Sequence, residues 1–435
     1  MYAERQRRVN SVVAVIAAKV DREAFPGKLE ISANSLRVRV IAPRPARAVN
    51  RRRTAQAIVT ALRRRDATTL ALPVKTTRGV GLGEVESVAR EARRYLTAPL
   101  VVLGAGPPIN ISPRRLSRLL QVEEVGSFNA GRVRLGVDAH AVGVLVERLA
   151  DRRDRAAVDA RLNAPPAPVI IDEKLDLGWS ARRAVVRVER ARLGRRLLRS
   201  AAKSAIVDAV RRQLHTARVP VLRQQPALTT KAARRAKFLI GTFTTYFECC
   251  QPRVTNIRLI ARAVDGVIIS PGERFSLNAV AGRRTRVGGY VPAPFIADGK
   301  VVPSVGGGVS QFATTMYNAA YFAGLAIDSH QPHSFYIPRY PPGREATLDY
   351  PSIDLAWTND TYAPILVRAV STASSVSVTL YGDNDGRRVR AESGPRVRLD
   401  GRDFAVTVTR VLRYRSGRSL RQAHSTSYDE PPPED

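Results

Sequence analysis

The sequence predicts an α+β fold spread over more than one domain. A chain of 435 residues with 44% hydrophobic residues is long enough for roughly two to four domains with sizeable cores. A helix-plus-strand pattern occurs twice in the first half of the chain, and strand-like alternation dominates the end of the second half. We therefore expect two helix-plus-strand repeat modules followed by a mixed α/β domain with antiparallel strands.

The first element that we expect is a helix around the apolar run from Val12 to Ala18. A basic start precedes the run, as in a secretory signal peptide, but Lys19 and Asp21 follow it without a recognisable cleavage site. The run is also far shorter than the roughly 20 apolar residues of a membrane span. We interpret it as a buried helix, and an export signal is the alternative.

Two pairs of similar segments indicate an internal repeat. QAIVTALRR at 56–64 resembles SAIVDAVRR at 204–212, and an apolar run ending in Pro-Val follows each. Ahead of them, VDREAF at 20–25 resembles VDARLN at 158–163, and both lead into β-rich sequence. These matches predict a partial first module over residues 1–97 and a second module over 98–237.

The second module has an upstream part that the first lacks. Ser112 followed by Pro113 is typical of a helix start, and Asp138 is a helix cap before an amphipathic run. Because Met1 falls close to the VDREAF segment, we expect that the chain begins inside a module. The hypothesis that follows is an export or anchoring segment encoded upstream of Met1.

Arginine dominates the charge of the chain. The formal net charge is +33, from 71 Lys and Arg against 38 Asp and Glu, which favours an anionic partner such as nucleic acid, an acidic lipid surface or a phosphate-bearing wall polymer. The stretch RLGRRLLR at 192–199 reads as an amphipathic helix whose basic face could touch anionic polymer or lipid headgroups. Aromatic residues for base stacking are nearly missing from such patches, which argues against single-stranded nucleic acid.

From Phe238 the composition shifts towards Tyr, Phe, Thr and Gly, and a third domain is predicted over residues 238–382. RVTNIRLIARAVDG and QFATTMYNAAYFAGLAI have apolar residues at helical spacing, the second stopping at Gly324. Strands follow in IDLAWTN, PILVRAV and SVSVTLYG, the last two joined as a hairpin. A strand extension over 383–428 and a disordered acidic tail over 429–435 complete the chain.

The most informative stretch is GGGVSQFATTMY, from Gly306 to Tyr317. Gly306, Gly307 and Gly308 can adopt positive φ angles and direct several backbone N–H groups at one point, and the start of the following helix adds partial positive charge. Ser310 and Gln311 would stand at that helix start. An anion or a polarised carbonyl group could bind there.

This stretch, PHSFYIPRYPPGREAT at 332–347 and SIDLAWTND at 352–360 closely resemble the VanW family of bacterial cell-envelope proteins. The upstream modules resemble the peptidoglycan-binding repeats that commonly precede that domain. The resemblance implies L,D-transpeptidase activity, in which a cysteine at the position of Ser310 attacks a stem-peptide carbonyl. A serine hydroxyl has no comparable ionised fraction and needs a general base, so the sequence leaves open whether the chain is an enzyme.

Candidate site residues come from these motifs. A catalytic arrangement of Ser310, His333 and Asp354 is conceivable, while the structural alternative has His333 hydrogen-bonded in a turn and Asp354 satisfying backbone groups. The binding candidates are the three glycines with Gln311, Arg339, Tyr340 and Arg344, of which the arginines could pair with a stem-peptide carboxylate. We expect no metal site and no cofactor, because the pair His330 and His333 lacks further ligands.

The leading functional hypothesis is an extracytoplasmic cell-envelope protein that binds peptidoglycan or its precursors without cysteine-based catalysis. The alternative is an acyl transferase that uses Ser310 with His333. A third alternative, a basic nucleic-acid-binding protein, rests on net charge alone.

Overall fold

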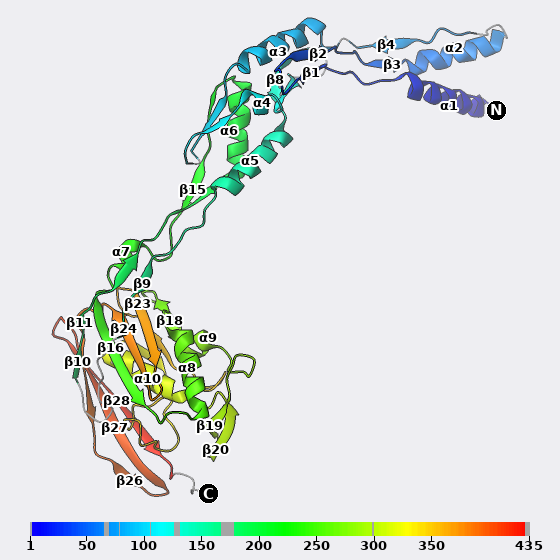
Figure 1. Cartoon of the computed structure of the whole chain (residues 1–435). Coiled ribbons are helices and arrows are strands. Elements are labelled where there is room, and N and C mark those ends of the chain that lie inside the picture. The colour runs from blue at the N-terminus through cyan, green and yellow to red at the C-terminus, as the bar shows by residue number, and fades with distance from the viewer. Residues whose placement is uncertain are drawn as a thin grey trace. The chain divides into compact units, whose positions relative to one another are not determined.

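A computed structural model of the protein describes residues 2–64, 69–77, 79–104, 106–125, 131–166, 178–297 and 300–430. The chain divides into two compact units (Figure 1). Unit 1 comprises Met1–Ala156 and Leu193–Gln224, and unit 2 comprises Ala157–Arg192 and Gln225–Asp435. No helix in the described part of the chain is both long enough and apolar enough to span a membrane.

Unit 1 is built from helices and short strand pairs. Its elements are α1 (Tyr2–Val20), β1 (Lys28–Ile31), β2 (Val38–Ile41), β3 (Arg47–Val49), α2 (Arg51–Arg64), β4 (Val74–Thr76), α3 (Leu82–Tyr95), β5 (Leu100–Leu103), β6 (Ile109–Ile111), α4 (Pro113–Leu116), β7 (Leu120–Glu124), β8 (Val133–Val137), α5 (Ala139–Arg153), β13 (Gly194–Leu197), α6 (Arg199–Arg211), β14 (Thr216–Arg218) and β15 (Val221–Gln224). The main core of the unit lies among α3, α5, α6 and the strands β5 to β8. A second, much smaller cluster joins α1 to α2.

Two local predictions for unit 1 are corrected by the structure. Residues 194–197 form strand β13, paired antiparallel with β15, so the stretch 192–199 is not an amphipathic helix. The strand pairing buries Leu197, and helix α6 begins only at Arg199. Helix α1 exists as predicted, but only one side of it is buried, because Val12 is 50% exposed.

Unit 2 contains the remaining elements. They are β9 (Arg161–Asn163), β10 (Gly178–Ser180), β11 (Arg182–Arg183), β12 (Arg187–Glu189), α7 (Thr230–Ala233), β16 (Phe238–Tyr246), α8 (Pro252–Val264), β17 (Ile268–Ile269), β18 (Arg274–Ser276), α9 (Leu277–Ala281), β19 (Pro292–Ala297), β20 (Lys300–Val305), α10 (Ser310–Ala323), β21 (Ala326–Ser329), β22 (Ala356–Thr358), β23 (Ile365–Ser371), β24 (Ser375–Gly382), β25 (Arg388–Ser393), β26 (Val397–Leu399), β27 (Arg402–Arg413) and β28 (Ser419–Tyr428).

Antiparallel sheets surround one buried helix in unit 2. One sheet has the order β11-β16-β24-β23-β17, and another has the order β10-β25-β27-β26 with β28 added beside β27. Helix α10 packs against β16 and β24 of the first sheet and β25 of the second, and its residues from Gln311 to Ala323 are all buried. Helix α8 covers β23. The α+β class predicted from the sequence is confirmed, whereas the division into repeat modules stays a prediction.

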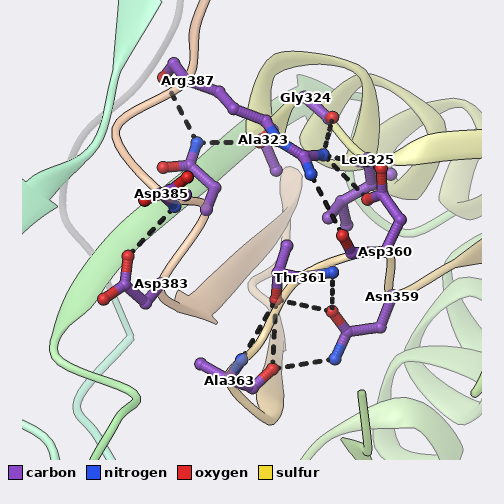
Figure 2. A network of polar contacts seen from close by, with 12 residues as sticks. Ala323, Gly324, Leu325, Asn359, Asp360, Thr361, Ala363, Asp383, Asp385 and Arg387 are labelled. Carbon is purple, nitrogen blue, oxygen red and sulfur yellow. Dashed lines mark hydrogen bonds and ion pairs between the residues drawn. The ribbon is translucent and has the colours of Figure 1, made fainter. Parts of the chain in front are cut away.

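Helix α10 stops where the sequence predicts. Gly324 adopts a left-handed conformation with a φ of 79°, which favours glycine after a helix end. Beyond it, the Arg387 Nη1 atom donates hydrogen bonds to the Gly324 carbonyl at 2.7 Å and to the Asp360 carboxylate at 2.8 Å (Figure 2). Asn384 Nδ2 donates to the Ala323 carbonyl. These contacts fix the C-terminal end of α10 within unit 2.

The later strand predictions hold in unit 2. The hairpin of β23 and β24 forms as expected, with its turn between Ser371 and Ser375. The β-rich segment predicted around 167–177 and most of the predicted tail, 431–435, lie outside the described residues.

Candidate functional site

The triglycine turn leads directly into α10. Gly308 has a φ of 85°, and a Cβ atom at Gly307 would lie 2.0 Å from the Ala293 carbonyl oxygen, so neither position accepts a side chain easily. Gly306 and Gly307 use their N–H groups in backbone hydrogen bonds of 3.1 and 2.9 Å. In the described part of the chain, the N–H groups of Gly308 and Ser310 donate to no backbone carbonyl. Two of the expected free donors therefore exist, and two do not.

A cavity of about 860 Å³ lies beside this turn. Its walls include Gly308, Ser310, His333, Arg339 and Tyr340, together with apolar and aromatic side chains from β16, β19 and the loop 333–340. Gly306 and Gly307, by contrast, are buried behind the lining. The helix start and the PHS loop thus meet at one cavity, although more than 20 residues separate them in the sequence.

Two arginines dominate the electrostatics of the cavity. Arg253, at the start of α8, and Arg339 both line it, and Glu248 is the carboxylate in the same wall. Burial and the nearby Arg339 lower the pKa of the Arg253 guanidinium from its ordinary value. A bound anion would relieve this repulsion between two cations. The sequence analysis did not identify Arg253, because an arginine in the first turn of an amphipathic helix carries no distinguishing pattern.

His333 is a neutral group in this site. Burial, with the Arg339 charge as a smaller cause, lowers the pKa of its imidazole to about 4. The ring stacks on Tyr340 with centroids 5.6 Å apart. Its buried Nδ1 atom has no hydrogen-bond partner among the described residues. The positive charge of the cavity near neutral pH therefore comes from the arginines.

Ser310 takes part in a polar contact row along one side of α10. Its Oγ accepts a hydrogen bond from the Leu348 N–H at 3.1 Å. One and two turns further on, Thr314 and Asn318 bind backbone groups of Ala346 and Arg344. The spacing of four residues places all three side chains on one helix face, where they hold the extended segment 344–348. This spacing was visible in the sequence, but its partners were not.

Gln311 anchors a different face of the same helix. Its Nε2 donates to the Tyr246 carbonyl at 2.8 Å and to the Thr245 hydroxyl at 3.1 Å, and the side chain is fully buried. Gln311 therefore joins α10 to β16 and is not among the residues that line the cavity.

The three proposed catalytic residues are only partly brought together. Ser310 and His333 line the same cavity, but no hydrogen bond among the described residues joins them. Asp354 lies outside the lining and accepts hydrogen bonds from the Ser276 hydroxyl and the Asn278 N–H. Because Ser276 also caps α9, the Asp354 carboxylate organises the start of that helix.

Arg344 and Glu345 are buried and do not line the cavity. Arg344 is 3% exposed, and its guanidinium lies over the Phe322 ring at 5.4 Å. Glu345 accepts a hydrogen bond from the Tyr428 hydroxyl, and burial raises the pKa of its carboxyl group to about 7. Within the described ranges, no group of three or more His, Cys, Asp or Glu side chains is placed to hold a metal ion.

Comparison with known proteins agrees with the motifs. The family model described as VanW like protein matches residues 252–381. Residues 252–381 form a VanW-like domain. A relative, the uncharacterized protein YoaR of Bacillus subtilis (strain 168), is 40% identical over 146 residues, which are 33% of this chain and 48% of the relative. The match therefore spans about half the length of that curated relative.

No solved structure matches the chain. The VanW-like domain contains Arg253, the glycine turn, α10 and the PHS loop, and therefore most of the cavity wall. The segment 246–251 at the end of β16 completes the wall just outside the matched residues.

Proposed function

We propose that the protein has a cell-wall-related function and that its VanW-like domain binds peptidoglycan or a precursor in the cavity beside α10. The family match supports the cell-wall role. The observation that carries the binding site is the placement of Arg253 and Arg339 in one cavity with Gly308 and Ser310, whose N–H groups donate to no backbone carbonyl of the described residues. We further propose a location in the cell envelope, outside the cytoplasm.

The chemistry of the cavity suits a peptide stem. Arginine guanidinium groups pair with carboxylates through two parallel hydrogen bonds, and Arg253 and Arg339 offer two such groups. Apolar and aromatic side chains such as Phe335 and Ile337 provide contact area for short aliphatic side chains. Glu248 offers an acceptor for an amine on the same ligand. A short peptide with a free carboxylate satisfies all three features.

The contacts of Ser310 favour binding over acyl transfer. Its oxygen already accepts the Leu348 N–H. A serine nucleophile needs a general base within hydrogen-bonding reach, and no hydrogen bond in the described residues connects Ser310 to His333. The one observation in favour of acyl transfer is that both side chains line the same cavity.

Cosedimentation with purified sacculi tests the proposal. We expect the wild-type protein to be retained, and we expect Arg339→Gln to reduce retention on the order of 10-fold, because a charge-assisted contact is lost. Arg286→Gln is the matched control, since it removes the same charge from an exposed position outside the cavity lining. Equal retention of the two variants would show that net charge alone binds the wall.

Release of D-alanine from tetrapeptide stems separates the two candidate functions. The binding proposal expects no release by the wild-type protein. Release that is abolished by Ser310→Ala would instead assign acyl transfer to the site. Activity that appears only in Ser310→Cys would indicate a pocket that still positions the substrate but lacks the nucleophile.

A further inference from the structure

Unit 1 contains two helix pairs, α1 with α2 and α5 with α6, that share the same internal contacts. Three pairs of residues correspond: Asp21 and Asp154, Val49 and Leu197, and Arg51 and Arg199. In both helix pairs the aspartate carboxylate accepts the N–H of the strand residue, at 2.6 Å in the first and 2.7 Å in the second. The same carboxylate lies 3.7 and 3.6 Å, respectively, from the arginine that begins the following helix.

The strands next to these helices correspond as well. Val49 of β3 pairs with Val74 of β4, and Leu197 of β13 pairs with Val221 of β15. In both cases the residue after the strand donates its N–H to the carbonyl of the proline that precedes the partner strand. The correspondence at Asp21 and Asp154 differs from the alignment of VDREAF with VDARLN, because it is set by contacts and not by local similarity. The two helix pairs are thus built alike.

The two helix pairs differ in how far the rest of unit 1 buries them. Helix α6 packs against β8 and β14, and β14 pairs in parallel with β5. Val210 of α6 is therefore fully buried, and Ala217 of β14 is 2% exposed. Their counterparts in the first pair are Leu62, which is 68% exposed, and Leu70, which is 44% exposed. No strand among the described residues pairs with 69–72.

The two helix pairs also differ in an ion pair at the end of the second helix. The Arg211 guanidinium, at the end of α6, donates two hydrogen bonds to the Glu123 carboxylate of β7. Its counterpart Arg63, at the end of α2, is exposed and has no carboxylate partner in the part of the chain that the structure describes. The segment that covers α5 and α6, residues 82–137, thus supplies both an apolar face and a carboxylate that the first helix pair lacks.

We propose that the surface formed by Val12, Leu62, Arg63 and Leu70 docks a partner polypeptide segment folded like residues 82–137. A strand of that segment pairs in parallel with residues 69–72, as β5 pairs with β14, its apolar residues cover Leu62, and a carboxylate meets Arg63. Residues 82–137 of this chain cannot be the occupant, because they already pack against α5 and α6. A second α1–α2 pair does not fit either, because it would place Arg63 and Arg64 against the same cations.

A tethered copy of the covering segment tests the docking surface in the chain from Gln6 onwards. A copy of residues 79–138 is joined directly to Gln6, so that the copied Asp138 precedes Gln6 as Asp138 precedes Ala139 in the second helix pair. Hydrogen exchange followed by mass spectrometry then compares peptides that contain residues 69–72. We expect exchange to slow on the order of 10-fold or more, because N–H groups that face solvent become paired.

The matched control carries Glu123→Lys in the added copy and Leu62→Asp in α2, and we expect it to lose the protection. Exchange that stays unchanged, or an added copy that remains unfolded, overturns the proposal, because a complementary surface would seat the copy. A second arm uses vesicles of anionic phospholipid with the unmodified chain. Binding that Leu62→Asp abolishes would identify a lipid surface as the occupant and would also overturn the proposal.

Discussion

The rest of unit 2 forms different hydrogen-bonding contacts with the two ends of helix α10. At the C-terminal end, Arg410 donates to the Tyr321 and Leu325 carbonyls at 3.0 and 2.9 Å. Arg387 and Asn384 donate to the carbonyls of Gly324 and Ala323, which lie between these two. At the N-terminal end, the N–H groups of Gly308 and Ser310 donate to no backbone carbonyl of the described residues, and a cavity lies beside them.

The difference distinguishes polar groups that stabilise the fold from polar groups that we propose bind a ligand. Carbonyl groups at a buried helix end are costly unless they are hydrogen-bonded, and here cations that also suit the helix dipole satisfy them. The opposite end attracts negative charge, yet two arginines, Arg253 and Arg339, line the cavity there with only Glu248 as a carboxylate among its lining residues. Positive groups gathered at a positive helix end are explained when an anion binds between them. The C-terminal end therefore stabilises the fold, and the N-terminal end is where we propose that a ligand binds.

The largest effect is expected at the capped end. Arg410→Ala removes the charged hydrogen bonds that the guanidinium donates to the buried carbonyl groups of Tyr321 and Leu325, so we expect the free energy of unfolding of unit 2 to fall by about 4 kcal/mol. Arg413→Ala, an exposed arginine on the same strand, is the control and should change it by no more than about 0.5 kcal/mol. Both tryptophans, Trp179 and Trp357, lie in unit 2, so fluorescence during urea unfolding measures this unit. Equal effects would contradict the capping role.

Glu345, on the segment that α10 holds, gives a pH-dependent effect. The pKa of its carboxyl group is raised to about 7 by burial, so the protonated form stabilises the fold fully below a pH of about 4.5, and this contribution is lost as the pH rises through about 7. Glu345→Gln should therefore gain stability relative to the wild type as the pH rises from 4.5 to 8, by up to about 3 kcal/mol.

Comparing the variant with the wild type at each pH isolates Glu345. Burial lowers the pKa values of His330 and His333 to about 4, so their contributions are lost as the pH falls below about 6.5, in the opposite direction. Those contributions are common to both proteins and cancel in the difference. A difference that does not vary with pH would show that the carboxyl group titrates normally.

The glycine turn offers the next test. Gly307→Ala places a Cβ atom against the Ala293 carbonyl oxygen, and we expect the free energy of unfolding of unit 2 to decrease by about 2 kcal/mol. Gly178→Ala is the matched control, because its nearest neighbour would be 3.9 Å away. The same urea titration measures both variants. A harmless Gly307→Ala would mean that the turn has more room than the structure indicates.

Ser310→Ala should have the smallest effect. It removes the acceptor of the Leu348 N–H, and we expect a loss of about 1 kcal/mol in the free energy of unfolding of unit 2, with stem-peptide affinity unchanged. Thr314→Val, the next residue in the same contact row, should lose a similar amount. If Ser310→Ala abolished ligand binding while Thr314→Val did not, Ser310 would be a ligand-contacting group.

Local sequence patterns predicted the elements of unit 2 well. Apolar spacing gave α8 and α10, and Gly324 marked the end of α10, because both signals arise within one element. Strand β13 was mistaken for a helix because leucines at helical spacing also fit a strand whose partner, β15, lies more than 20 residues further on. Pairing between distant segments has no local signature.

For the site too, local motifs predicted part of the arrangement, and contacts between distant segments were not predictable. The glycine turn, Ser310, His333 and Arg339 were found from motifs, and they do line one cavity apart from the two buried glycines. Asp354 and Gln311 have partners that only the fold brings near, in α9 and β16. Arg253 was missed for the same reason, since its importance comes from its proximity to Arg339.

The most direct test of the proposed anion site compares two ligands by calorimetry. One is a soluble stem peptide with a free C-terminal carboxylate, and the other is the same peptide with a C-terminal amide. We expect the wild-type protein to bind the carboxylate form on the order of 10-fold more tightly, and we expect Arg253→Gln combined with Arg339→Gln to bind both forms equally. Equal affinities in the wild-type protein, or a preference that survives the loss of both arginines, would contradict a carboxylate-binding site at the start of α10.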